Sequence, residues 1–194
     1  MRVYGAGAFC LVLQQKLGLT LCSPSDELLL QVPARFLNRQ VTRQTLGEIL
    51  SSTFPSFIKP VTPKQFRGAV YESEDALAAE CRGLPPGTAS FVSEPVTFAA
   101  EARTFVMDGL VLDAAVYEGK SDVVGAGQFV EALSHSMLLP RAVVVDVGFI
   151  DGRGWAVIEF NTAWGSGLNG CDPDEVLPAI AVAPEPITDS SAKN

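Results

Sequence analysis

The chain has 194 residues, of which 47% are hydrophobic and 19% charged, so it can form one or two compact units with a hydrophobic core. Its 14 Lys and Arg residues are outnumbered by 22 Asp and Glu residues, which gives a formal net charge of −8, and the basic residues are scattered. Nucleic acid and anionic membranes are therefore not expected as main partners. No apolar run approaches the ~20 residues of a membrane-spanning helix, and a cytoplasmic protein is expected.

The cysteines and the N-terminal stretch give no sign of secretion. Cys10, Cys22, Cys81 and Cys171 are widely spaced and form no CxxC pair, so buried thiols are expected rather than a disulfide framework or a zinc site. The opening "MRVYGAGAFCLVLQQKLG" is apolar, but glycines interrupt it and it lacks a convincing cleavage site. A signal peptide is therefore not expected.

The first quarter of the chain predicts a strand end followed by helices. Residues 3–5 resemble the end of a strand, and the spacing in "FCLVLQQKLG" predicts a helix that Gly18 ends. Ser23 is the expected N-cap of a second helix that runs through "ELLLQV". Thr42 is the expected N-cap of a third helix, "RQTLGEILSS".

Short strands dominate the rest of the chain. "SFIKP" and "AVYES" predict two strands, and Ser73 begins a helix over "SEDALAAECRG". The strand-like segments "ASFVSEPV", "EARTFVMDG" and "LVLDAAVYEG" follow, and Asp108-Gly109 predicts a hairpin between the last two. A helix around 126–138 precedes two more strands. This order predicts an α+β fold of two layered lobes.

Several short motifs do not identify a site. "GAGAFC" and "GAGQFV" lack the third glycine and the βαβ unit of a dinucleotide-binding fingerprint, so dinucleotide binding is not expected. "GSGLNGC" has Cys171 where a phosphate-binding loop requires lysine. His135, the single histidine, is expected to be an exposed or capping residue rather than part of a catalytic triad.

An acidic hairpin is the most informative feature of the sequence. "AVVVDVGFI" and "WAVIEFN" flank a glycine-containing turn and predict two antiparallel strands. If the turn is centred between Gly152 and Arg153, Asp146 lies directly opposite Glu159, and Asn161 points to the same face. The other face would present four apolar side chains to a core: Val145, Val147, Ile158 and Phe160.

Two facing carboxylates on a half-buried sheet repel each other and require compensation. A hard divalent cation provides it, because carboxylate and amide oxygens suit Mg²⁺, which completes its shell with substrate phosphate and water. A solvated sheet face without a ligand is the alternative, and a register slip of one residue would separate the carboxylates.

Basic residues elsewhere could hold phosphates that such a magnesium ion bridges. Lys59 lies in "SFIKP", and Lys64 lies in the loop that follows. Strand alternation puts Glu101, Arg103 and Phe105 on one face of "EARTFV". Each residue alone is typical of a surface charge, but together with the acidic hairpin they form the parts of a nucleotide–magnesium site.

The order of these segments resembles the ATP-grasp superfamily, especially its compact members related to the ribosomal-protein glutamate ligase. The segments are "FIKP" with the later lysine, "FVSEPV", "EARTFVMDG", "VVVDVGF" and "VIEFNTAWGSG". The resemblance covers roughly residues 38–183, and its most specific piece is an Asp followed by Glu-x-Asn across a hairpin. It implies an ATP-grasp fold, in which two α+β lobes with largely antiparallel sheets sandwich the nucleotide.

The resemblance also implies roles for the basic residues. Lys59 and Lys64 would bind the phosphates of ATP, and Lys59 and Arg103 would be catalytic. Arg103 would bind the γ-phosphate and the acyl phosphate that forms from it. Glu101 would orient Arg103 or meet the ribose.

The remaining roles concern the adenine, the metal and the acceptor. The segment 92–96, with Ser93, Glu94 and Val96, would be a hinge that recognises adenine through backbone groups, and Glu94 would lie near the adenine or ribose. The "TAWGSG" turn would lie near the acceptor substrate. Magnesium would be held by three residues: Asp146, Glu159 and Asn161.

The implied domains are a remnant of an N-terminal α/β domain with helices (1–37), a first lobe (38–92), a second lobe (93–183) and a disordered tail (184–194). Most relatives have a complete N-terminal domain, of which "MRVYGAGAF" resembles the last strand, so a shortened or truncated form is expected. The loop from Pro60 to Gly68 lacks a glycine-rich flap, and Arg39 or Arg43 would replace a lysine of relatives.

The implied activity is an ATP- and Mg-dependent ligation of a carboxylate to an amine or thiol through an acyl phosphate. The expected partners are small-molecule or peptide substrates and a second copy of the chain in a homodimer. Two alternatives stay open: a nucleotide-binding or interaction module that has lost ligase activity, and a metal-dependent hydrolase in which water is the nucleophile.

Overall fold

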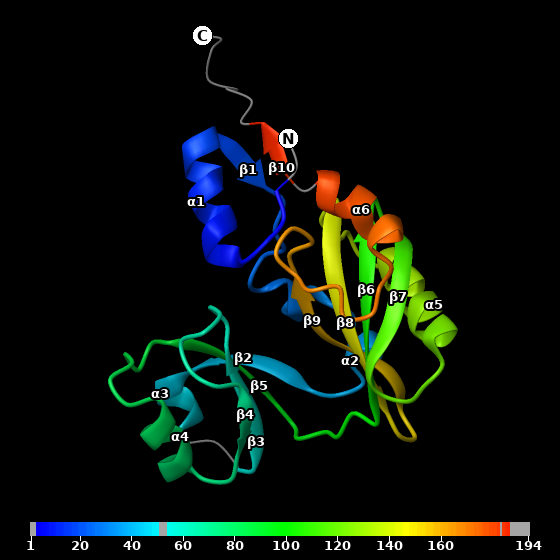
Figure 1. Cartoon of the computed structure of the whole chain (residues 1–194). Helices are drawn as coiled ribbons and strands as arrows, with labels where there is room; N and C mark the ends of the chain where they lie inside the picture. Colours follow the sequence, from blue (N-terminus) through cyan, green and yellow to red (C-terminus); the bar gives the residue numbers. More distant parts are fainter. Residues whose placement is uncertain (1–2, 51–53, 183, 187–194) are drawn as a thin grey trace. The chain divides into compact units, whose positions relative to one another are not determined.

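A computed structural model describes residues 3–50, 54–182 and 184–186. The chain divides into two compact units: unit 1 combines Met1–Ser25 with Phe98–Asn194, and unit 2 is Asp26–Thr97 (Figure 1). Each unit contains a four-stranded antiparallel sheet with helices, so the predicted α+β class is confirmed.

The predicted lobe boundaries at 37/38 and 92/93 stay a prediction. The compact units, which are defined by contacts within the chain, change at 25/26 and 97/98. Most of the tail predicted to be disordered, residues 187–194, lies outside the described residues. None of the helices in the described segments has the length and hydropathy that a membrane span requires.

Unit 2 is built on the sheet β2-β5-β3-β4, in which each neighbouring pair is antiparallel. Its strands are β2 (Val41–Thr45), β3 (Ser56–Pro60), β4 (Ala69–Tyr71) and β5 (Ala89–Ser93). Its helices are η1 (Leu28–Gln31), α2 (Ala34–Leu37), α3 (Leu46–Ile49) and α4 (Glu74–Glu80). The Ser73 hydroxyl caps α4 as predicted, accepting a hydrogen bond from the backbone of Ala76 at 3.2 Å.

Two helices predicted for the first part of the chain are shorter than predicted, and both of their predicted N-caps are wrong: only η1 (Leu28–Gln31) and α3 (Leu46–Ile49) form in these segments. Thr42 lies inside strand β2, because β5 supplies a complete set of ladder partners for this segment, and the short helix α3 begins only after Thr45. Thr45 and Glu48 form the capping box of α3, in which the Thr45 backbone donates to Glu48 Oε2 at 2.7 Å. Ser23 caps no helix; its hydroxyl accepts from Trp164 Nε1 at 3.3 Å.

Unit 1 is built on the sheet β7-β6-β8-β9, whose four strands lie side by side in Figure 1. Its strands are β6 (Ala100–Met107), β7 (Leu110–Gly119), β8 (Ala142–Ile150) and β9 (Gly154–Asn161). Its helices are α1 (Gly7–Leu17), α5 (Val123–Ser134) and α6 (Pro173–Val182), and β1 (Leu19–Leu21) pairs with β10 (Pro184–Pro186).

Local signals in unit 1 are confirmed in most places. Gly18 ends α1 in the left-handed conformation at φ 60°, and Asp108 and Gly109 form the β6–β7 turn at φ 50° and 81°. The strand predicted at residues 3–5 is absent from the described part of the N-terminus, where residues 3–6 have no regular structure.

One face of strand β8 carries both core residues and a residue of the polar site. This face presents Ala142, Val144 and Asp146, because residues two apart on a strand point to the same side. Ala142 and Val144 pack with Phe105 in a hydrophobic cluster that includes residues of α6, and Asp146 lies next to that cluster. Val145 and Val147 are buried as predicted, while Ile158 and Phe160 are only partly buried. All four cysteines are free thiols, and three of them are buried: Cys10, Cys81 and Cys171.

The buried hydroxyl of Ser90 is expected to lower the stability of unit 2. It is fully buried in β5, and its hydroxyl has no hydrogen-bond partner among the described residues. Because an unpaired buried hydroxyl is costly to desolvate, Ser90→Ala is expected to raise the free energy of unfolding by about 1 kcal/mol in urea denaturation. Ser93→Ala is the control, since the Ser93 hydroxyl donates to the Glu94 carbonyl at 3.2 Å. A Ser90→Ala protein no more stable than wild type would contradict this.

Candidate active site

Three adjacent strands of unit 1 bring four polar side chains to one face of the sheet. The register pairs Arg103 of β6 with Asp146 of β8, and Asp146 with Glu159 of β9. Opposed residues of antiparallel strands point to the same side, and Asn161 lies two residues after Glu159. We name Arg103, Asp146, Glu159 and Asn161 the Asp146 cluster. The predicted convergence of the two carboxylates and the amide is confirmed.

The hairpin pairs Asp146 with Glu159 as predicted, but the position of its turn differs from the predicted one. Its turn is centred on Gly152, not between Gly152 and Arg153. That turn alone would set Asp146 opposite Ile158. A β-bulge adds one residue to β9 next to Asp146, and this extra residue brings Glu159 opposite the carboxylate. The predicted turn centre is therefore wrong, and the bulge restores the predicted pairing.

Arg103 and Asp146 form a bidentate ion pair at the centre of the cluster. Arg103 Nε donates to Asp146 Oδ1 at 2.8 Å, and Nη2 donates to Oδ2 at 2.7 Å. The side chains are only 11% and 3% exposed, so water screens the pair weakly. Burial raises the pKa of Asp146, and the hydrogen bonds and charge of Arg103 act against that rise. The same hydrogen bonds raise the pKa of Arg103.

Asn161 links the two carboxylates. Its Nδ2 donates to Asp146 Oδ2 at 2.9 Å and to Glu159 Oε1 at 3.0 Å. The amide therefore places positive hydrogen atoms between two groups that would otherwise repel each other.

The donor set of the cluster fits a hard divalent cation. Within residues 3–50, 54–182 and 184–186, no group of three or more His, Cys, Asp or Glu side chains is placed to hold a metal ion, so a metal here would need Asn161 as third ligand. Half a turn of the Asn161 amide would replace Nδ2 by Oδ1 at the same spot. Two carboxylates and one amide oxygen, with water and phosphate, suit Mg²⁺.

The segment after β9 folds back onto Arg103. Arg103 Nη1 donates to the Gly167 carbonyl at 2.8 Å, and the Cys171 thiol donates to the Arg103 carbonyl at 3.6 Å. Burial raises the pKa of that thiol to about 12. The Tyr4 hydroxyl donates to the Ser166 carbonyl at 2.8 Å, so the N-terminal stretch also holds this segment. The predicted acceptor-side turn thus lies beside Arg103.

Tyr117 connects Glu101 to Arg103, and sequence reasoning missed it. Its hydroxyl donates to Glu101 Oε2 at 2.6 Å, and the Arg103 guanidinium carbon lies 5.9 Å from the centroid of its ring. Burial and the hydrogen bond to Glu101 raise the pKa of Tyr117. Tyr117 is the extra residue of a β-bulge in β7, and strand alternation gives no signal for such an insertion.

The predicted lysines lie in unit 2. Lys59 is partly buried in β3, and its Nζ lies 6.0 Å from the centroid of the Phe91 ring in β5. Lys64 is exposed in the following loop, with a left-handed φ of 68°. That loop returns against β3, where a Cβ at Gly68 would lie 2.9 Å from Lys59 Cβ. Only glycine permits this approach, which keeps the loop beside Lys59.

The predicted hinge residues also begin in unit 2, directly after β5. Ser93 is buried at the end of the strand, Glu94 is exposed, and Val96 is partly buried in a segment without regular structure. Burial lowers the pKa of Arg39, and the charge of Glu94 opposes that shift, so these two side chains interact. Arg39 is one of the two residues expected to replace a lysine of relatives.

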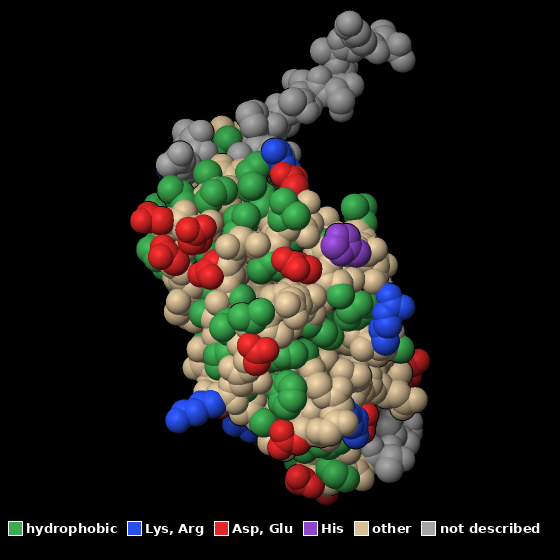
Figure 2. All heavy atoms as spheres, turned by 90° about the vertical axis from the view of Figure 1, so that its right-hand side faces the viewer, with side chains coloured by type: hydrophobic (Ala, Val, Ile, Leu, Met, Phe, Trp, Pro, Cys, Tyr) green, Lys and Arg blue, Asp and Glu red, His purple; other side chains and the backbone are tan. Residues whose placement is uncertain are grey.

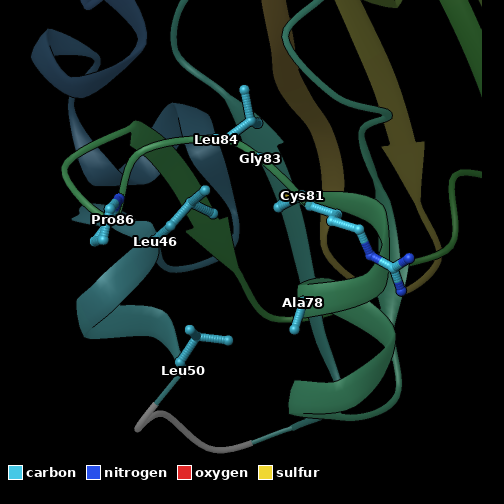
Figure 3. A pocket seen from close by; sticks show the side chains of 8 residues that line it. Leu46, Leu50, Ala78, Cys81, Gly83, Leu84 and Pro86 are labelled. Carbon is cyan, nitrogen blue, oxygen red and sulfur yellow. The ribbon is translucent and has the colours of Figure 1, made fainter.

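One cavity of unit 2 is unrelated to these residues. It measures about 230 Å³, and Figure 3 shows that its lining comes from α3, from α4 and, for the most part, from the residues that follow these helices. Its lining is mainly apolar, which does not suit phosphate, and contains no predicted site residue: Leu46, Leu50, Ala78, Cys81, Arg82, Gly83, Leu84 and Pro86. On the molecular face in Figure 2, acidic side chains are spread among apolar ones, and Lys and Arg form no continuous patch there.

The comparison with family models decides the membership. The model of the ATP-grasp domain, R2K clade family 2, matches residues 36–179, which is more than half of the chain. The chain belongs to this ATP-grasp family. The resemblance inferred from the sequence is therefore confirmed, as is the ATP-grasp fold with two α+β lobes. A comparison with curated proteins gives no match.

Several solved structures share the fold of this family member. A RimK domain ATP-grasp protein from Sphaerobacter thermophilus is 18% identical with a TM-score of 0.57, and the match covers 80% of this chain and 62% of that protein. D-cycloserine synthetase DcsG is 16% identical (TM-score 0.56, 82% and 69% covered). D-alanine–D-alanine ligase from Bacillus anthracis in complex with ATP is 13% identical (TM-score 0.55, 90% and 74% covered). At these identities the likeness shows the fold alone.

Substitution of Arg103 tests how much its ion pair with the buried Asp146 contributes to the stability of this ATP-grasp chain. Arg103→Gln is expected to lower the free energy of unfolding by about 3 kcal/mol near pH 7.5, since Asp146 would be buried without its counter-charge. The loss should shrink toward about pH 5, because a buried acid with a raised pKa takes up a proton in the folded state as the pH falls. Urea denaturation at both pH values measures this.

Two controls define that experiment. Arg141→Gln breaks the exposed pair with Asp108, whose atoms are 3.4 Å apart, and should change stability by less than about 0.5 kcal/mol. Arg103→Gln combined with Asp146→Asn should recover most of the loss, because no buried charge remains. Equal losses in the single and double variants would contradict the explanation.

Proposed function

We propose that the chain is an ATP- and Mg-dependent carboxylate–amine (or thiol) ligase that acts through an acyl phosphate. The Asp146 cluster carries this proposal, because two carboxylates and an amide converge beside an arginine in a member of the ATP-grasp family. The similar solved structures include a D-alanine–D-alanine ligase and a D-cycloserine synthetase, which supports the reaction class. The acid and the amine are small molecules or peptides in this proposal.

Asp146, Glu159 and Asn161 would hold the magnesium ion, which when bound would neutralise phosphate charge. Arg103 would contact the γ-phosphate. A guanidinium has five N–H donors, and the described bonds of Arg103 to Asp146 and Gly167 use three of them. Two donors thus remain for phosphate oxygens without loss of the ion pair.

The other predicted residues complete the proposal. Lys59 and Lys64 would add positive charge at the phosphates, and the backbone of Ser93, Glu94 and Val96 would contact the adenine. A substrate carboxylate oxygen then attacks the γ-phosphorus, and ADP leaves. The amine or thiol attacks the acyl carbon, and phosphate leaves. Positioning and charge neutralisation carry most of this chemistry, so no general base is required of the chain.

A nucleotide-binding or interaction module without ligase activity is the second candidate. One observation favours it: both oxygens of Asp146 already accept hydrogen bonds from Arg103 and Asn161, so the cluster is satisfied without a metal. ADP release that depends on an acid and an amine, tested over a panel of both, distinguishes the ligase from this module. ATP binding with no ADP release over the panel would favour the module.

Nucleotide binding is tested by thermal unfolding with ATP. With millimolar ATP and Mg²⁺, the unfolding temperature is expected to rise by about 5 °C, since saturation near 100 times Kd adds about 2.7 kcal/mol. Removal of Mg²⁺ with a chelator, Glu159→Gln or Asp146→Ala should abolish the rise, because each removes part of the metal site. Glu131→Gln, which neutralises an exposed acid on α5, should keep it. No rise for the wild type at millimolar ATP and Mg²⁺ would refute the proposal.

A further inference from the structure

Tyr117 occupies an unusual position in the sheet of unit 1. The β6–β7 register passes from Glu101 opposite Glu118 to Ala102 opposite Val116, which leaves Tyr117 as the unpaired residue of a bulge. Bulges re-aim side chains and are frequent next to active sites. Here the bulge directs a large aromatic side chain toward two residues of the proposed site.

Each end of the Tyr117 side chain contacts a different charged residue. The hydroxyl donates to Glu101 Oε2 at 2.6 Å, a short charge-assisted hydrogen bond. The ring lies near the Arg103 guanidinium, with 5.9 Å between the guanidinium carbon and the ring centroid, which is within range of a cation–π interaction. One side chain therefore limits the movement of both a carboxylate and a guanidinium.

Arg103 is held on its other edges as well. Asp146 accepts from Nε and Nη2, and the Gly167 carbonyl accepts from Nη1. These bonds are made by N–H groups, whereas Tyr117 attracts the guanidinium through the face of its ring, 5.9 Å from Arg103 Cζ. Tyr117 thus adds a contact of another kind to the hydrogen bonds.

We propose that Tyr117 is a positioning residue that fixes Glu101 and Arg103 in the orientation in which Arg103 receives the γ-phosphate. The proposal rests on the proposed function for its ligand, ATP. It makes a specific demand: loss of Tyr117 contacts should weaken binding of ATP, which has a γ-phosphate, more than binding of ADP, which lacks one. A residue that only supports the fold would affect both nucleotides equally.

The test compares Mg-ATP and Mg-ADP by isothermal titration calorimetry. Tyr117→Phe removes the hydroxyl and Tyr117→Leu also removes the ring; ATP affinity is expected to fall about tenfold and further, respectively, while ADP affinity stays within about twofold. Tyr71→Phe is the matched control, because the Tyr71 hydroxyl also donates over 2.6 Å, but to the Arg67 carbonyl in unit 2. It should leave both affinities within about twofold. Equal losses of ATP and ADP affinity in the Tyr117 variants would overturn the proposal.

A measurement without nucleotide separates this proposal from the proposed function. The side-chain Nε–H signal of Arg103 in ¹⁵N NMR, assigned by its loss in Arg103→Lys, reports how firmly the guanidinium is held. Its exchange with water is expected to quicken about tenfold in Tyr117→Leu and to stay unchanged in Tyr71→Phe. If the wild type binds no nucleotide, the proposed function fails. An Arg103 exchange rate that Tyr117→Leu leaves unchanged overturns the positioning role in either case.

Discussion

The buried ion pair between Arg103 and Asp146 is the interaction on which the candidate site depends. It joins the two central strands of the unit 1 sheet, and Asn161 and Gly167 are bound to one or the other partner. Such a pair offsets its desolvation only when the remaining hydrogen-bonding groups are also satisfied. Both oxygens of Asp146 meet this condition, so the pair can persist in a largely buried position and still present donors to a ligand.

Two irregularities shape the site around this pair. A bulge in β9 brings Glu159 opposite Asp146, and a bulge in β7 directs Tyr117 toward Glu101 and Arg103. They lie on the two outer strands, on either side of the central pair of strands. A regular ladder would give neither arrangement, since each side chain would move to another partner or face. The two central strands of the sheet thus pair regularly, and the irregularities lie on the outer strands. Strand β9 adds Glu159 and Asn161 to the Asp146 cluster, and strand β7 places Tyr117 beside it.

Sequence patterns sufficed where the deciding information is local. The Asp108-Gly109 turn and the Gly18 helix end follow from backbone preferences of those residues, and both are confirmed. Local sequence predicts a helix at Thr42, because its strand partner, Val92 of β5, lies 50 residues away and leaves no local signal. Strand alternation predicts the facing carboxylates but not the bulge that aligns them, because insertion of one residue depends on the neighbouring strand. The position of Tyr117 depends on a bulge in the same way, so alternation does not predict it.

The proposed magnesium site at the Asp146 cluster is tested by a crystal structure with Mg²⁺ and a non-hydrolysable ATP analogue. We expect a six-coordinate cation about 2.0–2.1 Å from oxygens of Asp146, Glu159 or Asn161 and from the terminal phosphates, with Asn161 Oδ1 turned toward the metal. Nucleotide and metal bound away from this cluster, with the Asn161 amide still bridging the carboxylates, would contradict it.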